Sequence, residues 1–433
     1  MLSGQNERLR TLLFGVTFLL VVFVVAVPHR FLYPLQFQPG VFGILFRALP
    51  YVPTILFFTL ICAALSLEPE PGFKGTLVLK SALVWLLTTA GSSLGSEFPA
   101  HALYRDLYYA ITGVGVAYLC RSGFRNRHLL AARGLAALSG VVGIVCVIEF
   151  ITGRNPVYSE IFNLDNAVYA RFAPDAFGSR VIATVGHPVY LGSLLALVLP
   201  ISLWSVLSGR GISRVLAVGL LLFTVLGLLL TFTRGAWLSG AIAGLAYLKG
   251  KSRKQIWTAG VCVLALLAGG ISIDRVWSTF ESRDTIAQLK GFRTDQRGVA
   301  YQQATDILSR HPAFGVGTGL YRLAGNRVGD FNDTPDNMYL RMLAEHGVIG
   351  FLAALVLFGI LVRHLRTTRH RLVACDRQEE SDLCQAVLCG LIGFFVDLLT
   401  CDALYFSATR ISFWAVVGLG LSLSVAIPRK LKL

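Results

Sequence analysis

The sequence predicts an all-α polytopic membrane protein. Of its 433 residues, 55% are hydrophobic and 15% are charged, whereas a soluble domain carries about 25% charged residues. The apolar residues also occur in long blocks, of which "LLFGVTFLLVVFVVAV" from Leu12 is the plainest. Blocks of about 20 apolar residues are typical of transmembrane helices, in which the backbone satisfies its own polar groups.

About twelve apolar blocks are long enough to be transmembrane spans. They lie at residues 11–28, 41–67, 74–95, 102–120, 129–152, 187–207, 213–232, 235–249, 256–273, 347–364, 383–402 and 408–427. The chain is therefore expected to have three parts. Residues 1–273 hold spans one to nine with a shorter exported loop at 153–186, residues 274–346 form a large exported loop, and residues 347–433 hold the last three spans.

The basic residues predict the orientation of these spans. Alternate loops carry the Lys and Arg residues, in "RSGFRNRH" (121–128), "RGISR" (210–214), "KGKSRK" (249–254) and "RHLRTTRHR" (363–371). Short basic loops mark the cytoplasmic side, and both termini fall on that side. The net charge of +15 is thus explained by topology, and nucleic acid is not an expected partner.

The remaining composition excludes several kinds of site. The eight cysteines lie mostly in or beside apolar blocks without metal-ligand spacing, so neither a zinc site nor a disulfide framework is expected. The stretch "GVGTG" follows no strand of a parallel sheet, so it is not a dinucleotide fingerprint. A transporter or flippase is the alternative outside the enzymes, but it would hold ionisable residues near mid-membrane. Here the charges collect at the exported ends of the spans.

Three arginines on the exported side are candidate anion ligands. Arg234 lies in the tight turn "TFTRGAWLSG", Arg180 ends the first long loop, and Arg297 begins a predicted helix (297–311) in the second. A guanidinium group binds phosphate oxygens through two parallel hydrogen bonds, and a helix N-terminus adds positive potential. For Arg234, a snorkelling side chain at the membrane boundary is the alternative.

The segment "DTPDNMYLRMLAEHGVIGFL" (333–352) supplies two candidates for a general base. Asp336 is expected to be the N-cap of a helix. His346 lies about 15 Å further along a straight helix, close to the hydrocarbon boundary, and an imidazole can act as a base near neutral pH. We therefore expect His346 to be the base. Asp397 and Asp402 could pair with the arginines.

Together these segments resemble the O-antigen ligase and O-antigen polymerase superfamily. The resemblance is carried by "TFTRGAWL", by Arg297 opening a helix in a large exported loop, by "DNMYLRMLAEHGVIG" and by the "VGHPVYLG" span, over roughly residues 180 to 355. It implies a GT-C-like glycosyltransferase of the bacterial inner membrane that needs no metal or other cofactor. The large loop, partly helical and between spans nine and ten, would be periplasmic, with the active site facing the periplasm.

The resemblance also implies the substrates. The donor would be a glycan on undecaprenyl diphosphate, and for a ligase the acceptor would be a sugar hydroxyl of the lipid A–core oligosaccharide, in lipopolysaccharide biosynthesis. A polymerase, which joins two lipid-linked glycans, is the alternative. Arg234 and Arg297 would hold the diphosphate, with Arg180 as a third contact.

The chain departs from the family at one position. The family pattern is His-Asn, about nine residues, then Gly-x-x-Gly. Asn337, Gly347 and Gly350 fit this spacing, but Asp336 occupies the His position. The departure leaves Asp336 or His346 as the base, and the depth and ordinary pKa of a histidine favour His346.

Overall fold

The computed structural model describes residues 11–22, 60, 77–157, 180–249, 251, 291–325 and 334–425, and within these ranges it contains helices and no strand. The elements are α5 (Leu77–Leu94), α6 (Pro99–Ala110), the π-helix η4 (Ile111–Gly115), α7 (Val116–Gly123), α8 (His128–Thr152), α10 (Pro188–Ser208), α11 (Gly211–Leu230), α12 (Arg234–Leu248), α15 (Gly291–Arg310), α16 (Tyr321–Gly325), α17 (Met338–Ala374), α18 (Gln378–Asp397), the 3-10 helix η8 (Ala403–Tyr405) and α19 (Ser407–Val425). A further apolar helix spans Thr11–Val22.

Helices occupy the predicted spans wherever the structure describes them. The predicted spans at 256–273 and, apart from residue 60, at 41–67 lie outside the described residues. Within the described part, six helices are long and apolar enough to cross a membrane, namely α5, α8, α10, α11, α17 and α19. The total of twelve spans stays a prediction.

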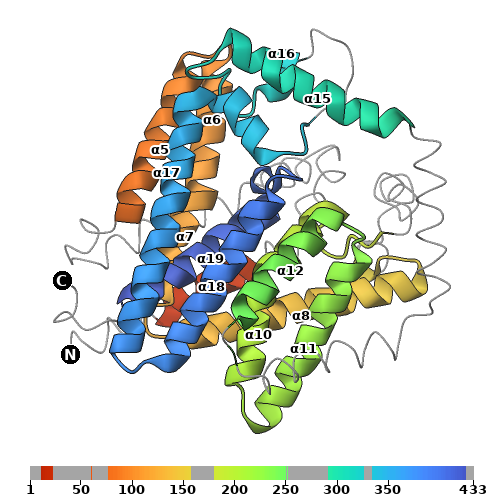
Figure 1. Cartoon of the computed structure of the whole chain (residues 1–433), viewed down its shortest axis with the longest axis vertical. Helices are drawn as coiled ribbons and strands as arrows, with labels where there is room; N and C mark the ends of the chain where they lie inside the picture. Colours follow the sequence, from red (N-terminus) through yellow and green to blue (C-terminus); the bar gives the residue numbers. More distant parts are fainter. Residues whose placement is uncertain are drawn as a thin grey trace, which may run out of the picture.

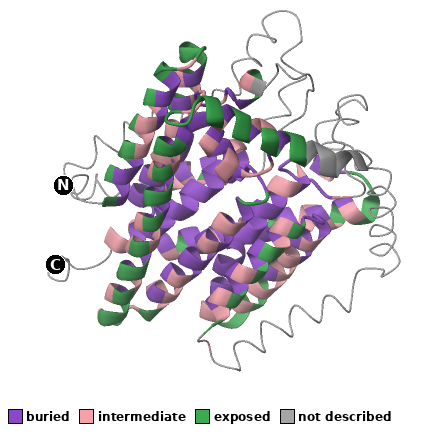
Figure 2. Cartoon of the chain, turned by 45° about the horizontal axis from the view of Figure 1, so that its top comes forward, coloured by how far each residue is buried: buried purple, intermediate pink, exposed green. Residues whose placement is uncertain are grey.

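The distribution of exposed side chains identifies a multi-pass membrane protein. Helices α10 and α19 are apolar and almost wholly buried, whereas α11 and α17 are more apolar but have only 28% and 33% of their most apolar stretch buried. Exposed apolar side chains include Val215 and Leu216 on α11 and Val356 on α17, and Figure 2 shows exposed residues along the outer helices. A soluble protein rarely exposes such extended apolar surface, so these helix faces contact lipid.

Helix α10 lies at the centre of the bundle and packs against α8, α11, α12, α18 and α19 (Figure 1). Helix α17 packs along α5 and α18, and α8 crosses the bundle obliquely. Helices α15 and α16 lie across one end of the bundle. A small apolar cluster of Ala304, Ile307, Tyr321 and Ala344 joins α15 and α16 to the start of α17.

The basic segments gather at the opposite end of the bundle. Arg133 on α8 pairs with Glu379 on α18 at 3.0 Å, and Lys251 after α12 pairs with Asp382 at 2.6 Å. The Trp204 indole near the end of α10 donates to the Glu379 carbonyl at 3.2 Å. The segments predicted to share one side of the membrane therefore do meet in space. Which compartment they face stays a prediction.

Helix α17 contains a sharp kink that the sequence analysis did not predict. Gly347 has φ 63° and ψ −170°, and a side chain there would collide with the backbone of Ala313. The kink separates a short helix, Met338–His346, from a long one that runs at an angle to it (Figure 1).

The long part of α17 also ends later than predicted. It continues to Ala374 instead of ending at residue 364, so "RHLRTTRHR" (363–371) forms helical turns and not a loop. The 27 residues after the kink span about 40 Å, which exceeds the hydrocarbon thickness of about 30 Å. The basic turns therefore extend beyond the hydrocarbon.

Candidate functional site

Arg180 and Arg234, which are 54 positions apart in the sequence, meet at one turn. The Arg180 side chain donates from Nε to the Thr231 carbonyl at 2.8 Å and from Nη2 to Thr233 Oγ1 at 2.6 Å. Thr233 is the N-cap residue of α12, and Arg234 follows it as an exposed side chain. No carboxylate of the described residues pairs with Arg234. Two arginine residues thus lie at the same helix N-terminus, where an anion is favoured.

A buried carboxylate holds the segment that carries Arg180. Glu149, near the end of α8, accepts from the backbone amides of Ile182 at 3.2 Å and Ala183 at 2.7 Å. The Asn155 side chain donates to the Ala183 carbonyl at 2.9 Å. Glu149 was not among the predicted site residues, although an acidic residue near the end of an apolar span was a usable signal.

The helix that follows Asp336 is capped by its neighbour. Asn337 Oδ1 accepts from the amides of Tyr339 at 3.0 Å and Leu340 at 3.2 Å. The prediction that Asp336 is the N-cap is therefore wrong by one residue. Asp336 precedes the cap with φ 41°, in the left-handed region that Asp and Asn tolerate better than most residues. Such backbone conformations concentrate at functional sites.

Asp336 and Arg234 lie on either side of the turn that follows α18. At one side of this turn, the Leu398 carbonyl accepts from the amide of Met338, two residues after Asp336, at 2.9 Å. At the other side, Thr400 packs so closely on Gly235 that a side chain at that position would collide with it. The turn therefore joins the start of α17 to the start of α12, and brings Asp336 toward the two arginines.

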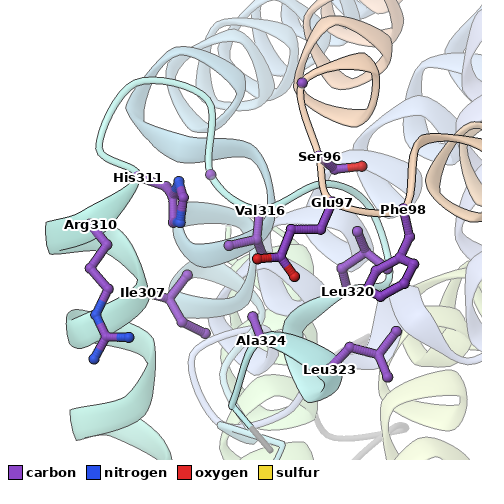
Figure 3. A pocket seen from close by; sticks show the side chains of 12 residues that line it. Ser96, Glu97, Phe98, Ile307, Arg310, His311, Val316, Leu320, Leu323 and Ala324 are labelled. Carbon is purple, nitrogen blue, oxygen red and sulfur yellow. The ribbon is translucent and has the colours of Figure 1, made fainter. Parts of the chain in front are cut away.

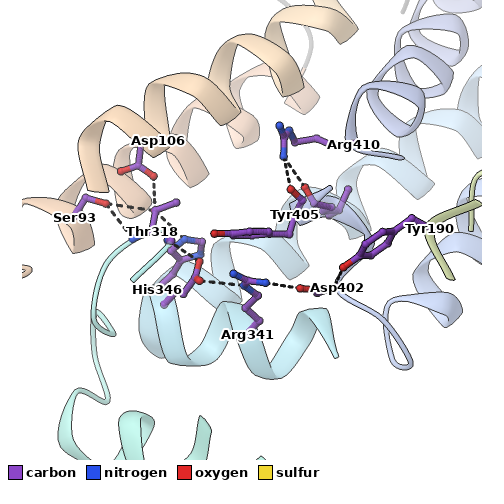
Figure 4. Close-up of polar contacts among 12 residues, drawn as sticks. Ser93, Asp106, Tyr190, Thr318, Arg341, His346, Asp402, Tyr405 and Arg410 are labelled. Carbon is purple, nitrogen blue, oxygen red and sulfur yellow. Dashed lines mark hydrogen bonds and ion pairs between the residues drawn. The ribbon is translucent and has the colours of Figure 1, made fainter. Parts of the chain in front are cut away.

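His346 lies at the opposite end of the short helix and is buried. Its Nε2 is 3.1 Å from Thr318 Oγ1. Thr318 donates to Asp106 on α6, and the Ser93 hydroxyl on α5 donates to Thr318 at 3.4 Å (Figure 4). The predicted depth of His346 assumed a straight helix, and the kink at Gly347 contradicts that assumption. His346 faces α5 and α6, not the turn that carries the arginines.

An ionic network connects the two ends of the short helix (Figure 4). Arg341 is 1% exposed and pairs with Glu345 at 3.1 Å and with Asp402. The same guanidinium lies 3.3 Å from the centroid of the Tyr405 ring, and the Tyr190 hydroxyl donates to Asp402 at 2.7 Å. Asp402 thus pairs with Arg341 and not with the predicted arginines. Because every charge here is buried and partnered, removing one would leave its partner uncompensated.

A pocket of about 150 Å³ opens beside the His346 end of the short helix (Figure 3). Its walls include Glu97 and His311 as polar groups and Phe98 and Leu320 as apolar ones. The loop 313–319 forms one side and is fixed to the short helix, because its amides donate to the carbonyls of residues 344 and 345 at 3.1 and 2.8 Å. This mixture of an aromatic face and polar groups suits a ligand with both hydroxyl and CH surfaces.

Arg297 stays a predicted anion ligand. It lies in α15, which begins at Gly291 and not at Arg297 as predicted, and its side chain is outside the described residues. Within the described part of the chain, no group of three or more His, Cys, Asp or Glu side chains is arranged to hold a metal ion.

Comparison with known proteins gave one family. Residues 217–355 match the family model described as O-antigen ligase. The matched range begins in α11 and ends just after the kink in α17, so it includes Arg234, Arg297, Asp336 and His346. No match was found among curated proteins.

Proposed function

From the match of residues 217–355 to the O-antigen ligase family model, we propose that the chain is a member of the O-antigen ligase and polymerase superfamily. We propose further that it transfers a glycan from undecaprenyl diphosphate to a sugar hydroxyl of the lipid A–core oligosaccharide. The observation that carries this proposal is the turn at which Arg180 is fixed beside the exposed Arg234. Two guanidinium groups without a described carboxylate at Arg234 suit a diphosphate better than a neutral ligand. Arg297 is proposed as a further diphosphate contact.

The arginines would act on the leaving group. In the proposed reaction, the acceptor oxygen forms a bond to the anomeric carbon, and the bond from that carbon to the diphosphate oxygen breaks. Undecaprenyl diphosphate leaves with an additional negative charge. Cations that are already in place when this charge develops lower the barrier, because they need no reorganisation.

A base must accept the proton of the acceptor hydroxyl. We assign this role to Asp336, because Asp336 is half-buried and lies across one turn from Arg234, whereas His346 is buried among Thr318, Ser93 and Asp106. His346 would then be a positioning residue that fixes the loop 313–319. The alternative is that His346 is the base, and the two variants described in the Discussion distinguish these assignments.

The pocket between α5, α15 and α16 is the proposed site for further sugars of the acceptor. The short helix lies between this pocket and Asp336, and its nine residues span about 13 Å. That length corresponds to an oligosaccharide and not to a single sugar. An acceptor that reaches from Asp336 to Phe98 and Glu97 would therefore be recognised over several sugars.

The proposed location is the bacterial inner membrane, with both termini in the cytoplasm and the site in the periplasm. The gathering of basic segments at the end of the bundle opposite the site supports this orientation. The proposed division into residues 1–273, 274–346 and 347–433, with twelve spans, accompanies it.

Reconstitution tests the function. The purified protein in liposomes would receive undecaprenyl-diphosphate glycan and rough lipopolysaccharide, with no nucleotide or metal added. We expect glycan-modified lipopolysaccharide on gels. A polymerase would instead lengthen the lipid-linked glycan when lipopolysaccharide is omitted. A folded protein that forms neither product would contradict both assignments.

A further inference from the structure

A second cavity lies at the basic end of the bundle, far from the site described above. It has a volume of about 420 Å³ and lies among the ends of α10 and α12 and the starts of α11 and α18. Its lining residues are Trp204, Leu207, Ser208, Gly209, Arg210, Arg214, Tyr247, Lys251, Gln378, Glu379 and Asp382. None of these residues has a part in the proposed transfer reaction.

Two arginines in this cavity have no carboxylate partner among the described residues. The acidic residues are neutralised, because Asp382 pairs with Lys251 at 2.6 Å and Glu379 pairs with Arg133 at 3.0 Å. No carboxylate in the described ranges pairs with Arg210 or Arg214. The cavity therefore carries a local positive charge, and an anion would be attracted to it.

Buried hydroxyl groups in the same cavity also lack partners. Tyr247 is 0% exposed, and its hydroxyl has no hydrogen-bond partner among the described atoms. The Ser208 hydroxyl has none either. Buried polar groups are almost always hydrogen-bonded in native proteins. A hydroxyl that lines a cavity and lacks a protein partner therefore points to a ligand, and the nearby arginines indicate that this ligand is an anion with acceptor oxygens.

An apolar crevice adjoins this cavity. It has a volume of about 180 Å³, lies between α8, α10 and α11, and shares Gly209 with the basic cavity. Leu216, Leu220 and Leu221 form one wall. On the same helix, Ile212 is 81% exposed at the first turn of an apolar span. The basic cavity is thus at headgroup depth, and the crevice extends from it toward the hydrocarbon.

We propose that these two adjoining cavities bind one anionic phospholipid. Its phosphate contacts the guanidinium groups of Arg210 and Arg214 and accepts a hydrogen bond from the Tyr247 hydroxyl, while one acyl chain occupies the crevice. Charge-assisted hydrogen bonds from arginine are among the strongest in proteins, and basic pockets between transmembrane helices suit anionic headgroups. The site is at the opposite end of the bundle from the proposed transfer site, so it is an independent binding site.

Native mass spectrometry and thermal unfolding of the full-length protein in detergent test this proposal. The probes are dioleoyl phosphatidylglycerol, dioleoyl phosphatidylcholine and inorganic phosphate. We expect phosphatidylglycerol to bind with one high-affinity copy and to raise the unfolding temperature. Equal binding of phosphatidylcholine would contradict recognition of an anionic headgroup. Stabilisation by phosphate alone, with no preference for the lipid, would contradict a lipid ligand.

Variants locate the effect at this cavity. Arg210→Gln with Arg214→Gln is expected to weaken phosphatidylglycerol binding about tenfold or more, since two charge-assisted contacts are lost. Arg363→Gln with Arg366→Gln, which removes two exposed cations on α17 outside the cavity, is the matched control and is expected to change binding less than about twofold.

Tyr247→Phe separates a binding role from a purely structural one. If the hydroxyl binds the lipid, this variant weakens lipid binding by about three- to tenfold but unfolds at the same or a higher temperature without lipid. If lipid binding is unchanged in this variant and in the double arginine variant, the proposed site is wrong.

Discussion

At the scale of single residues, Arg234 is the clearest test of the proposed diphosphate site. Arg234→Lys is expected to be nearly as damaging as Arg234→Ala, because an ammonium cannot form two parallel hydrogen bonds to phosphate oxygens. Loss of a charge-assisted contact of about 1.5–3 kcal/mol would slow transfer about ten- to a hundredfold. Initial rates at equal membrane abundance measure this. Arg366→Lys is the control, and a normal rate for the Arg234→Lys enzyme would exclude bidentate binding.

Asp336 and His346 are distinguished by a pair of substitutions. Asp336→Asn is expected to abolish transfer in a folded protein, because Asn cannot accept the proton and because the cap is Asn337. His346→Gln is expected to lower the rate but to retain its pH profile, since the imidazole would only position the loop 313–319. Rate against pH and thermal unfolding are the measurements. An inactive His346→Gln beside an active Asp336→Asn would assign the base to His346.

Phe98 tests the proposed acceptor pocket. Phe98→Ala is expected to raise the KM for lipopolysaccharide about tenfold with little change in kcat, because it removes binding that is equal in the ground and transition states. Leu107→Ala, an exposed position on α6 outside the pocket, is the control. A lower kcat at unchanged KM would argue against a binding role for Phe98.

The two arginines that the structure brings to one turn share a simple physical signal. Arg180 and Arg234 are cations at the ends of apolar spans, so composition alone places them at a membrane boundary. Glu149 carries the same kind of signal and was missed because it accepts from backbone amides, which have no signature in the sequence. The predicted N-cap was one residue too early, at Asp336 instead of Asn337, because Asp and Asn are both good caps and the sequence does not distinguish them.

At the scale of elements, the kink in α17 determines which residues can meet. Gly347→Ala is expected to destabilise the protein or to prevent folding, because Ala at φ 63° is strained and its side chain would collide with Ala313. Thermal unfolding in detergent measures the effect. Gly359→Ala, in the same helix with open space around it, is expected to be neutral or slightly stabilising. Similar unfolding temperatures for the two variants would show that the kink is not required.

Helix positions were predictable from the sequence, but the angle between two parts of one helix was not. Apolar blocks indicate spans because lipid requires them, and this locates α8, α10, α11 and α19 to within a few residues. The kink depends on one glycine conformation and on the distant backbone at Ala313. A straight helix from Asp336 into the membrane was therefore the natural expectation.

At the scale of the whole molecule, cysteine labelling tests the topology. On a cysteine-free background, Thr305→Cys on α15 is expected to react with a membrane-impermeant reagent from outside, and Thr367→Cys near the end of α17 is expected to react only after the membrane is opened. Both positions are exposed, so accessibility would reflect the side of the membrane. Labelling of position 367 from outside would invert the orientation.

The assembly of the candidate site was the part that the sequence did not reveal. Its components come from residue 180, from 231–235, from the start of α17 and from the turn after α18, and contacts between such distant segments follow no periodic pattern. The turn after α18 was considered only through Asp397 and Asp402, as possible partners of the arginines, and its position between the starts of α12 and α17 was not predicted.

The short helix Met338–His346 is positioned by protein loops and not by the lipid. Its start is bonded to the turn after α18, its end to the loop 313–319, and the kink separates it from the long part of α17. A change in bilayer thickness would therefore be absorbed by tilting of the long helices, while the spacing between Asp336 and the arginines stays the same. The proposed transfer step should proceed at the same intrinsic rate in bilayers of short-chain and long-chain lipids.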